Sequence, residues 1–313
     1  MDTIVPSQPV DPSGRRRFPT RGTAAAVAVL VTGIVLSGAL FVKLRQRQWD
    51  STAGDFERAV HNEASAFRRI LDGYFLVLET IQGFHAASES VERSEFHEFV
   101  KPFLRRHADL LAVQWVPWVR DSDRARHEAE TARDGCPGYQ IVDRMGGKDR
   151  QRAPRRESYF PICRVEPAAS NGALLGLDLA VSAAFCRVAE RSRDTGESLL
   201  TSAAILPHEE KNPALVRFVA PVYRNDVSLG TVQERRENLE GFVIAVTEAA
   251  GLLEESRSDL VPDGLDFCLA SRLEGGGQRL LVALPSRTRE PSDSAAALRQ
   301  PTPSAPLHHT EVL

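Results

Sequence analysis

Residues 158–167, SYFPICRVEP, place a phenol and a carboxylate close together in an otherwise apolar stretch. In a strand, alternation puts Tyr159 and Pro161 on one face and Phe160 on the other. Glu166 follows, and a carboxylate removed from water accepts strong, directional hydrogen bonds from ligand N–H groups. The same glutamate could instead be a solvated residue at a strand end. The segment therefore indicates ligand binding as one of two interpretations.

The sequence has no signature of a catalytic or metal site. It contains no GxSxG nucleophile motif, no HExxH motif and no phosphate-binding loop. The histidines His85, His97 and His107 are scattered, and the four cysteines form no CxxC pair. We therefore expect no catalytic residue, no metal and no cofactor. An exported hydrolase, the rival from another class, needs a nucleophile beside a base, and the sequence offers no such pair.

Two cysteines, Cys136 and Cys163, are candidates for a disulfide. Cys136 precedes the strand candidate 139–143, and Cys163 lies near the end of the candidate 158–165. If these strands form an antiparallel hairpin closed by the loop 144–157, the two thiols face each other at about the spacing that a disulfide requires. An oxidising compartment would preserve the bond. Two free cysteines buried as small apolar groups are the alternative.

The charged residues favour solvated surfaces. We expect one such surface on the helix candidate 121–134 and another on the basic loop 144–157. The residues concerned are Arg124, Arg126, His127, Glu128, Glu130, Arg150, Arg152, Arg155 and Arg156. Asp178 is interpreted as a helix N-cap. The net charge of −3 gives no basic footprint, so we expect no nucleic-acid partner.

One apolar run near the N-terminus is long enough to cross a membrane. Residues 23–42, TAAAVAVLVTGIVLSGALFV, carry no charge, and about 20 helical residues span a hydrocarbon core of roughly 30 Å. A slight excess of basic residues before the run favours a cytoplasmic, disordered segment 1–22 and an extracytoplasmic segment 43–313, in the periplasm or outside the cell. A cleaved signal peptide is the alternative, with small residues at Ser37-Gly38-Ala39.

Beyond the run, the periodicity predicts a long stalk helix over 43–93. Apolar residues recur at spacings of three and four from Phe56 to Ile81. Such a stripe favours pairing with a second copy of the chain, so we expect a parallel homodimer through the stalk. A second helix follows over 94–107, with Ser94 as its N-cap.

From Leu110 the pattern changes to short strands and helices, which indicates an α+β fold with antiparallel sheets. Strands are expected over 110–119, 139–143, 158–165, 214–223, 241–246 and 265–270, and helices over 121–134, 179–194 and 247–257. A short strand region and a disordered tail rich in Pro and Ser are expected over 271–313.

These segments, in this order, resemble the CHASE domain, the extracellular sensory module of membrane histidine kinases and nucleotide cyclases. The resemblance covers roughly residues 80–270, and we place the domain at 94–270. Five motifs carry it. They are Glu95-Phe96 and Phe99 ahead of LLAVQWVPWVRDSDRARHE, then SYFPICRVEP, then Leu175-Gly176-Leu177-Asp178 with Thr195-Gly196 and Leu200-Thr201 after it, then FVAPVY at 218–223, and LEGFVIAV at 239–246.

The resemblance implies a stalk helix that carries two stacked PAS-like subdomains, of which the membrane-distal one binds a small organic ligand. In plant hormone receptors of this family the ligand is an adenine-type cytokinin. Six residues resemble positions that line the family's pocket, and we expect them to surround one cavity. They are Tyr159, Glu166, Leu200, Thr201, Phe218 and Gly241. For Phe218 a place in the core, and for Gly241 a close approach of a neighbouring strand, are the alternatives.

The sequence departs from the family plan after residue 246, because no second run of membrane length and no kinase or cyclase motif follows. The leading interpretation is a membrane-anchored extracytoplasmic sensory module that is not an enzyme. The alternative is a truncated, inactive remnant of a receptor histidine kinase or diguanylate cyclase.

Overall fold

The computed structural model describes residues 21–88, 90–144, 151–202, 205, 215–256, 267–272 and 278–284. The chain divides into two compact units, 1–58 and 59–313. Of the segments predicted to be disordered, 1–20 and 285–313 lie outside the described residues, whereas Arg21 and Gly22 are helical.

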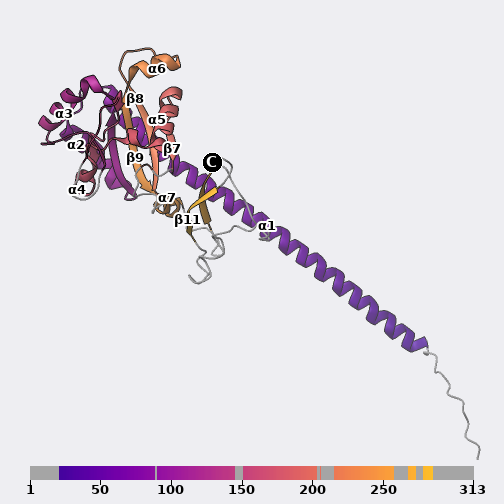
Figure 1. Cartoon of the computed structure of the whole chain (residues 1–313). Helices are drawn as coiled ribbons and strands as arrows, with labels where there is room; N and C mark the ends of the chain where they lie inside the picture. Colours follow the sequence, from indigo (N-terminus) through magenta and orange to yellow (C-terminus); the bar gives the residue numbers. More distant parts are fainter. Residues whose placement is uncertain are drawn as a thin grey trace, which may run out of the picture. The chain divides into compact units, whose positions relative to one another are not determined.

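Helix α1, Arg21–Ala86, opens the described chain (Figure 1). Its part Ala25–Gln48 is long and apolar enough to cross a membrane, in agreement with the run predicted at 23–42, although a signal sequence meets the same criterion. The helix ends at Ala86, before the predicted stalk end at residue 93. The second helix, α2 (Arg93–Arg106), has Glu92 and not Ser94 as its N-cap. The Glu92 N–H donates to the carboxylate of Glu95, which closes the first turn.

The centre of the second unit is a five-stranded antiparallel sheet with the order β6-β1-β9-β8-β7. Its strands are β6 (Arg164–Glu166), β1 (Leu110–Pro117), β9 (Leu239–Glu248), β8 (Leu215–Tyr223) and β7 (Leu199–Thr201). The long strands β1, β8 and β9 are rich in β-branched and aromatic residues and are buried on both faces. The sheet therefore has helices or loops on each side.

One face of the sheet, called here the α1 face, packs against α1, α2 and α7 (Ala249–Ser256). Alternate residues of β8 and β9 point to it, and Tyr74, Leu78 and Ile81 of α1 cover them at 0% exposure. Apolar side chains at a helical spacing meet apolar side chains at a strand spacing here. Much of the α1 stripe from Phe67 onwards is therefore buried within one chain.

The opposite face, called here the α5 face, is covered by α5 (Ala183–Thr195) and by residues 160–179. Phe185 and Ala189 of α5 pack on Phe242 and Ile244 of β9. The helix ends at Gly196, whose φ of 79° is the left-handed conformation that favours glycine at a helix end. Figure 1 shows α5 alongside β8 and β7.

The remaining elements are short. The helices are α3 (Arg124–Arg133), α4 (Ala168–Asn171) and α6 (Val232–Asn238), with 3-10 turns at Asp121–Asp123, Gly172–Leu174 and Leu179–Val181. The two-stranded sheets are β2 (Val119–Arg120) with β5 (Ser158–Tyr159), β3 (Val142–Arg144) with β4 (Gln151–Arg152), and β10 (Phe267–Arg272) with β11 (Gln278–Leu284). The α+β class with antiparallel sheets is therefore confirmed, whereas a stacked pair of PAS-like subdomains stays a prediction.

Candidate functional site

Glu166 and Phe218, both predicted to line one pocket, lie in one row across the α1 face. Register places Glu166 opposite Val113, Val113 opposite Ala245, and Ala245 opposite Phe218. Three strand spacings of about 4.8 Å separate the ends of this row by about 14 Å. The two residues therefore share a face without being neighbours.

Phe218 belongs to the core. Its side chain is 0% exposed, and its ring stacks on Tyr74 at 5.0 Å and meets Phe75 edge-on at 5.1 Å. Leu200, opposite Phe218 on the edge strand β7, is 42% exposed. The alternative of a core role is therefore the one that the structure supports for Phe218.

Glu166 is neither a solvated strand-end residue nor an open ligand group. It is 5% exposed, and one carboxylate oxygen lies 3.0 Å from His97 Nδ1 on α2. The same oxygen accepts the N–H of Ala168 at 3.2 Å. The carboxylate thus joins β6 to α2 and to the start of α4.

A glycine is needed at position 241 because the backbone of the neighbouring strand β1 lies very close to it. A Cβ on this residue would lie 2.5 Å from the Val116 oxygen and 2.7 Å from Pro117 Cα, both on β1. Backbone atoms cannot move aside as a flexible side chain can. The alternative interpretation, a close approach of two strands, is therefore confirmed.

Thr201 differs from the other predicted residues because it lies on the α5 face, opposite Arg217 of β8. Strand alternation places Arg217 on the face opposite Phe218, and places Gln114 of β1 on the same α5 face. Arg217 is 5% exposed and Gln114 is 6% exposed. Between their strands runs β9, with apolar side chains on this face.

Buried polar side chains on an otherwise apolar, covered surface are the usual composition of a small-molecule site. The sequence analysis missed Gln114 and Arg217. A signal was present, because Gln114 interrupts the apolar run LLAVQWVPWV and Arg217 immediately precedes FVAPVY. Only the sheet register shows that both lie on the α5 face, where Arg217 is opposite Thr201 and Gln114 is two strands away from Arg217.

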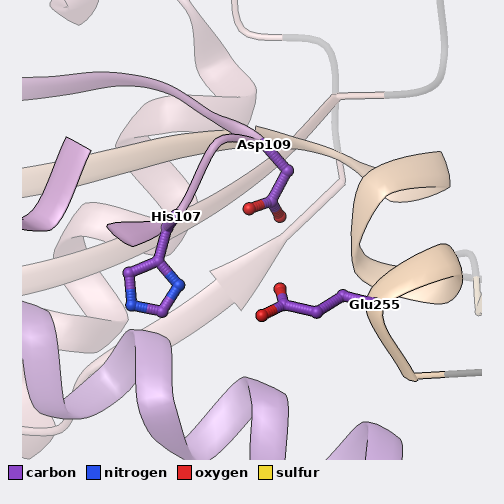
Figure 2. Close-up of side chains that lie close together, drawn as sticks. All are labelled: His107, Asp109 and Glu255. Carbon is purple, nitrogen blue, oxygen red and sulfur yellow. The ribbon is translucent and has the colours of Figure 1, made fainter. Parts of the chain in front are cut away.

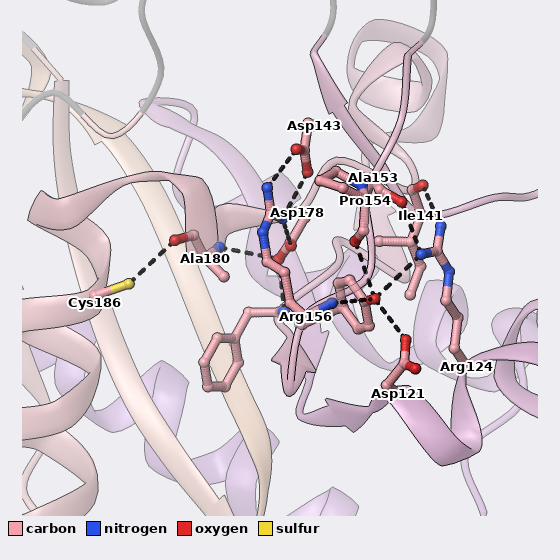
Figure 3. Close-up of polar contacts among 12 residues, drawn as sticks. Asp121, Arg124, Ile141, Asp143, Ala153, Pro154, Arg156, Asp178, Ala180 and Cys186 are labelled. Carbon is pink, nitrogen blue, oxygen red and sulfur yellow. Dashed lines mark hydrogen bonds and ion pairs between the residues drawn. The ribbon is translucent and has the colours of Figure 1, made fainter.

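Tyr159 is the centre of a polar network outside the main sheet. Its partners Asp121, Arg124 and Arg156 are labelled in Figure 3. Its ring is 0% exposed, and its hydroxyl donates to Asp121 at 2.7 Å and accepts the Arg156 N–H at 3.0 Å. Arg124, 8% exposed, donates to that hydroxyl and to the carbonyl oxygens of Ile141 and Ala153. Tyr159 therefore stabilises the loop that contains it. It lies outside the five-stranded sheet and is not a neighbour of Thr201.

The second part of the network is an ion-pair cluster. The Arg156 guanidinium pairs with Asp143 and, at 2.8 Å, with Asp178, whose side chain is 0% exposed (Figure 3). Asp178 also accepts the N–H groups of Phe160 at 2.7 Å and of Ala180 at 3.0 Å. Burial raises the pKa of Asp178, and these donors and Arg156 act in the opposite direction. The predicted N-cap role of Asp178 is confirmed by its bond to Ala180.

This cluster fixes the cover of the α5 face. Phe160, whose N–H binds Asp178, meets Phe185 at 5.6 Å and Phe242 at 5.7 Å. The segment 160–179 that covers the α5 face therefore contacts α5 and β9 through aromatic rings and pairs with Arg156 through the Asp178 carboxylate. The expectation of a solvated surface is wrong for Arg124, which is buried, whereas Arg156 is part-buried and paired with two carboxylates from distant segments.

The predicted disulfide between Cys136 and Cys163 is absent from the structure, where both residues are free thiols. The hairpin on which it depended is wrong, since β3 pairs with β4, β5 with β2, and β6 with β1. The segment 158–165 divides between two of these strands and does not form one. Cys136 accepts from Arg93 Nη1 at 2.6 Å, and buried Cys163 lies 3.6 Å from Thr131 Oγ1.

Comparison with known proteins adds two findings. The sequence model of the CHASE domain matches residues 89–282, more than half of the chain. A hybrid signal transduction histidine kinase A of Dictyostelium discoideum is 23% identical over 231 residues, which are 71% of this chain and 11% of that protein. The chain therefore spans only a small part of the length of this relative.

Proposed function

This chain belongs to the CHASE domain family, and from that premise we propose that it binds a small organic ligand on the α5 face while α1 anchors it to a membrane. CHASE is a sensory, non-catalytic domain of signal-transduction receptors. The observation that carries the ligand proposal is that Arg217, opposite Thr201, is buried on an apolar surface that also carries Gln114. The cover fixed by Arg156 and Asp178 would exclude water from the ligand.

The polar residues restrict the class of ligand. A guanidinium presents several N–H donors in a planar fork that matches a carboxylate or a phosphate. The amide of Gln114, two strands from Arg217 on the same face, can both donate and accept, and the surrounding surface is apolar. We therefore favour a small organic anion, for example a carboxylate on an apolar or ring-shaped body.

A thermal-shift screen of the full chain in detergent tests the ligand proposal. A compound that binds only the folded state must raise the melting temperature. We expect organic acids to raise the melting temperature. Arg217→Gln should weaken the affinity for these compounds about 10- to 100-fold, since hydrogen bonds to charged groups contribute roughly 1.5–3 kcal/mol.

Arg191→Gln, at an exposed position of α5, is the matched control and should leave the shift unchanged. Each shift is compared with the melting temperature of the same variant without ligand, so a loss of stability does not imitate a loss of binding. Equal responses of the wild type and Arg217→Gln would refute the site.

The proposed topology has residues 1–22 in the cytoplasm and 43–313 in the periplasm or outside the cell. It is supported by the single long apolar segment of α1 together with the sensory family. A reporter that is active only in the cytoplasm should be inactive when fused at residue 313 and active when fused at the N-terminus. Activity at both ends would contradict the proposal.

We further propose a parallel homodimer through α1. Much of the stripe is covered within the chain, yet Leu76 on the same helix is 62% exposed. Light scattering in detergent should show a dimer, and Leu76→Glu should shift it towards the monomer. A wild-type chain that is monomeric at high concentration would exclude this arrangement.

A further inference from the structure

A second group of polar side chains, apart from the residues assigned above, gathers where α2, β1 and α7 meet (Figure 2). His107 is the residue that ends α2, Asp109 precedes β1, and Glu255 lies on α7. One ligand atom from each lies within 4.8 Å of the others. Two carboxylates and an imidazole from three separate elements therefore converge on one point.

Asp109 is held in place by its surroundings. One of its carboxylate oxygens accepts the Tyr74 hydroxyl at 2.5 Å and the Thr247 hydroxyl at 3.1 Å. Thr247 also donates to the backbone oxygen of Asp109 at 2.9 Å. A Cβ on Gly251 would lie 2.6 Å from Asp109 Cβ, so the glycine permits α7 to come this close. Carboxylates that bind metal ions are commonly oriented in this way by hydrogen-bond donors.

His107 supplies an independent observation. Its Nδ1 is buried and has no hydrogen-bond partner. Figure 2 shows a nitrogen of its ring turned towards the two carboxylates, and the ring lies 5.1 Å from that of Tyr74. A buried nitrogen without a partner is unfavourable unless something binds it. A proton bridging to a carboxylate would satisfy it, and so would a metal ion.

We propose that His107, Asp109 and Glu255 form a binding site for a divalent transition-metal ion of the zinc class. Neutral imidazole and carboxylates are ordinary ligands of Zn²⁺, and two carboxylates balance its charge. Three protein ligands leave a fourth position for water. No metal-ligand spacing is visible in the sequence here, because Glu255 is far along the chain from the other two residues.

Such an ion would connect distant parts of the sensory domain. Through Asp109 and Tyr74 it would be coupled to α1, and through Glu255 it would hold α7, the helix that follows β9. The site thus joins the first described helix to the last described one. This inference does not depend on the ligand proposed for the α5 face.

Calorimetric titration of the full chain in detergent with Zn²⁺ tests the proposal. We expect one ion bound per chain and a rise in melting temperature. Glu255→Gln should weaken binding by at least about 10-fold, whereas Glu254→Gln, at the neighbouring exposed position of α7, should bind as the wild type does.

His107→Phe supplies the second test, because phenylalanine can keep the ring contact with Tyr74 but has no nitrogen. With Co²⁺ as a coloured probe, the wild type should develop visible absorption bands and His107→Phe should lack them. Failure of the wild type to bind Zn²⁺ or Co²⁺, or unchanged binding in both Glu255→Gln and His107→Phe, would overturn the proposal.

Discussion

Phe218→Ala is expected to lower the free energy of unfolding by about 3–5 kcal/mol, the usual cost of removing a buried aromatic ring. The ring is fully buried on the α1 face, between Tyr74 and Phe75. The cavity would open beneath α1, where the helix backbone cannot readily close it. Urea unfolding of the full chain in detergent measures the effect.

Leu200→Ala is the matched comparison, because Leu200 lies opposite Phe218 in the sheet but is 42% exposed. Leu200→Ala should lower the free energy of unfolding by only about 0.5 kcal/mol, as for most surface substitutions. If Phe218→Ala were as mild as Leu200→Ala while abolishing a ligand response, Phe218 would line a cavity, as its resemblance to a pocket position implied.

The second large expected effect is a loss of folding stability as the pH falls below neutral. Burial lowers the pKa of His85 to about 4, with the nearby Arg164 cation acting in the same direction. His85 is 7% exposed, its Nε2 has no hydrogen-bond partner, and its ring stacks on Trp115 at 4.2 Å. Protonation is therefore disfavoured in the folded state.

The direction of the change in stability with pH follows from the difference between the pKa values of His85 in the unfolded and the folded chain. The unfolded chain takes up the proton near pH 6.5 and the folded chain only near pH 4, so the stability from His85 is complete above pH 6.5 and is lost as the pH falls towards 4. From pH 7 to pH 5 the loss is about 2 kcal/mol from this residue. His127, whose pKa burial also lowers to about 4, adds in the same direction.

Unfolding measured from pH 7 to pH 5 tests this. His85→Phe, which can keep an aromatic contact with Trp115, should remove about 2 kcal/mol of the acid-dependent loss. The control His61→Gln, at an exposed position of α1, should leave the pH dependence as it is. An unchanged acid response in His85→Phe would show that His85 is already protonated, or is solvated, in the folded chain.

Much of the secondary structure could be predicted from the sequence. The apolar run at 23–42, the helix over 94–107 and the strands over 110–119 and 214–223 have close counterparts in the structure. Each depends on a periodicity or a composition within a few neighbouring residues. The resemblance to the CHASE domain over 80–270 agrees with the match over 89–282 for the same reason, since short motifs in a fixed order carried it.

The partners of each strand could not be predicted. Alternation showed that Tyr159 and Phe160 point to opposite sides, but nothing local showed that β5 would pair with β2 rather than with β3. Pairing depends on the whole chain, because backbone groups of one strand bind equally well to those of any other. The six matched positions are dispersed for this reason, and two of them, Glu166 and Phe218, share a face but are three strands apart.

By itself, the sequence determined the apolar N-terminal helix, the α+β class and the family, because these rest on composition, local period and the order of motifs. Only the tertiary structure decided which charged groups are buried or paired. Arg156 was expected to be solvated, but Asp143 and Asp178 pair with it. His107 had no metal-ligand spacing in the sequence, but Glu255 lies close to it in the fold. The burial and chemistry of a charged side chain are set by partners that are distant in sequence, and folding alone brings them within contact distance.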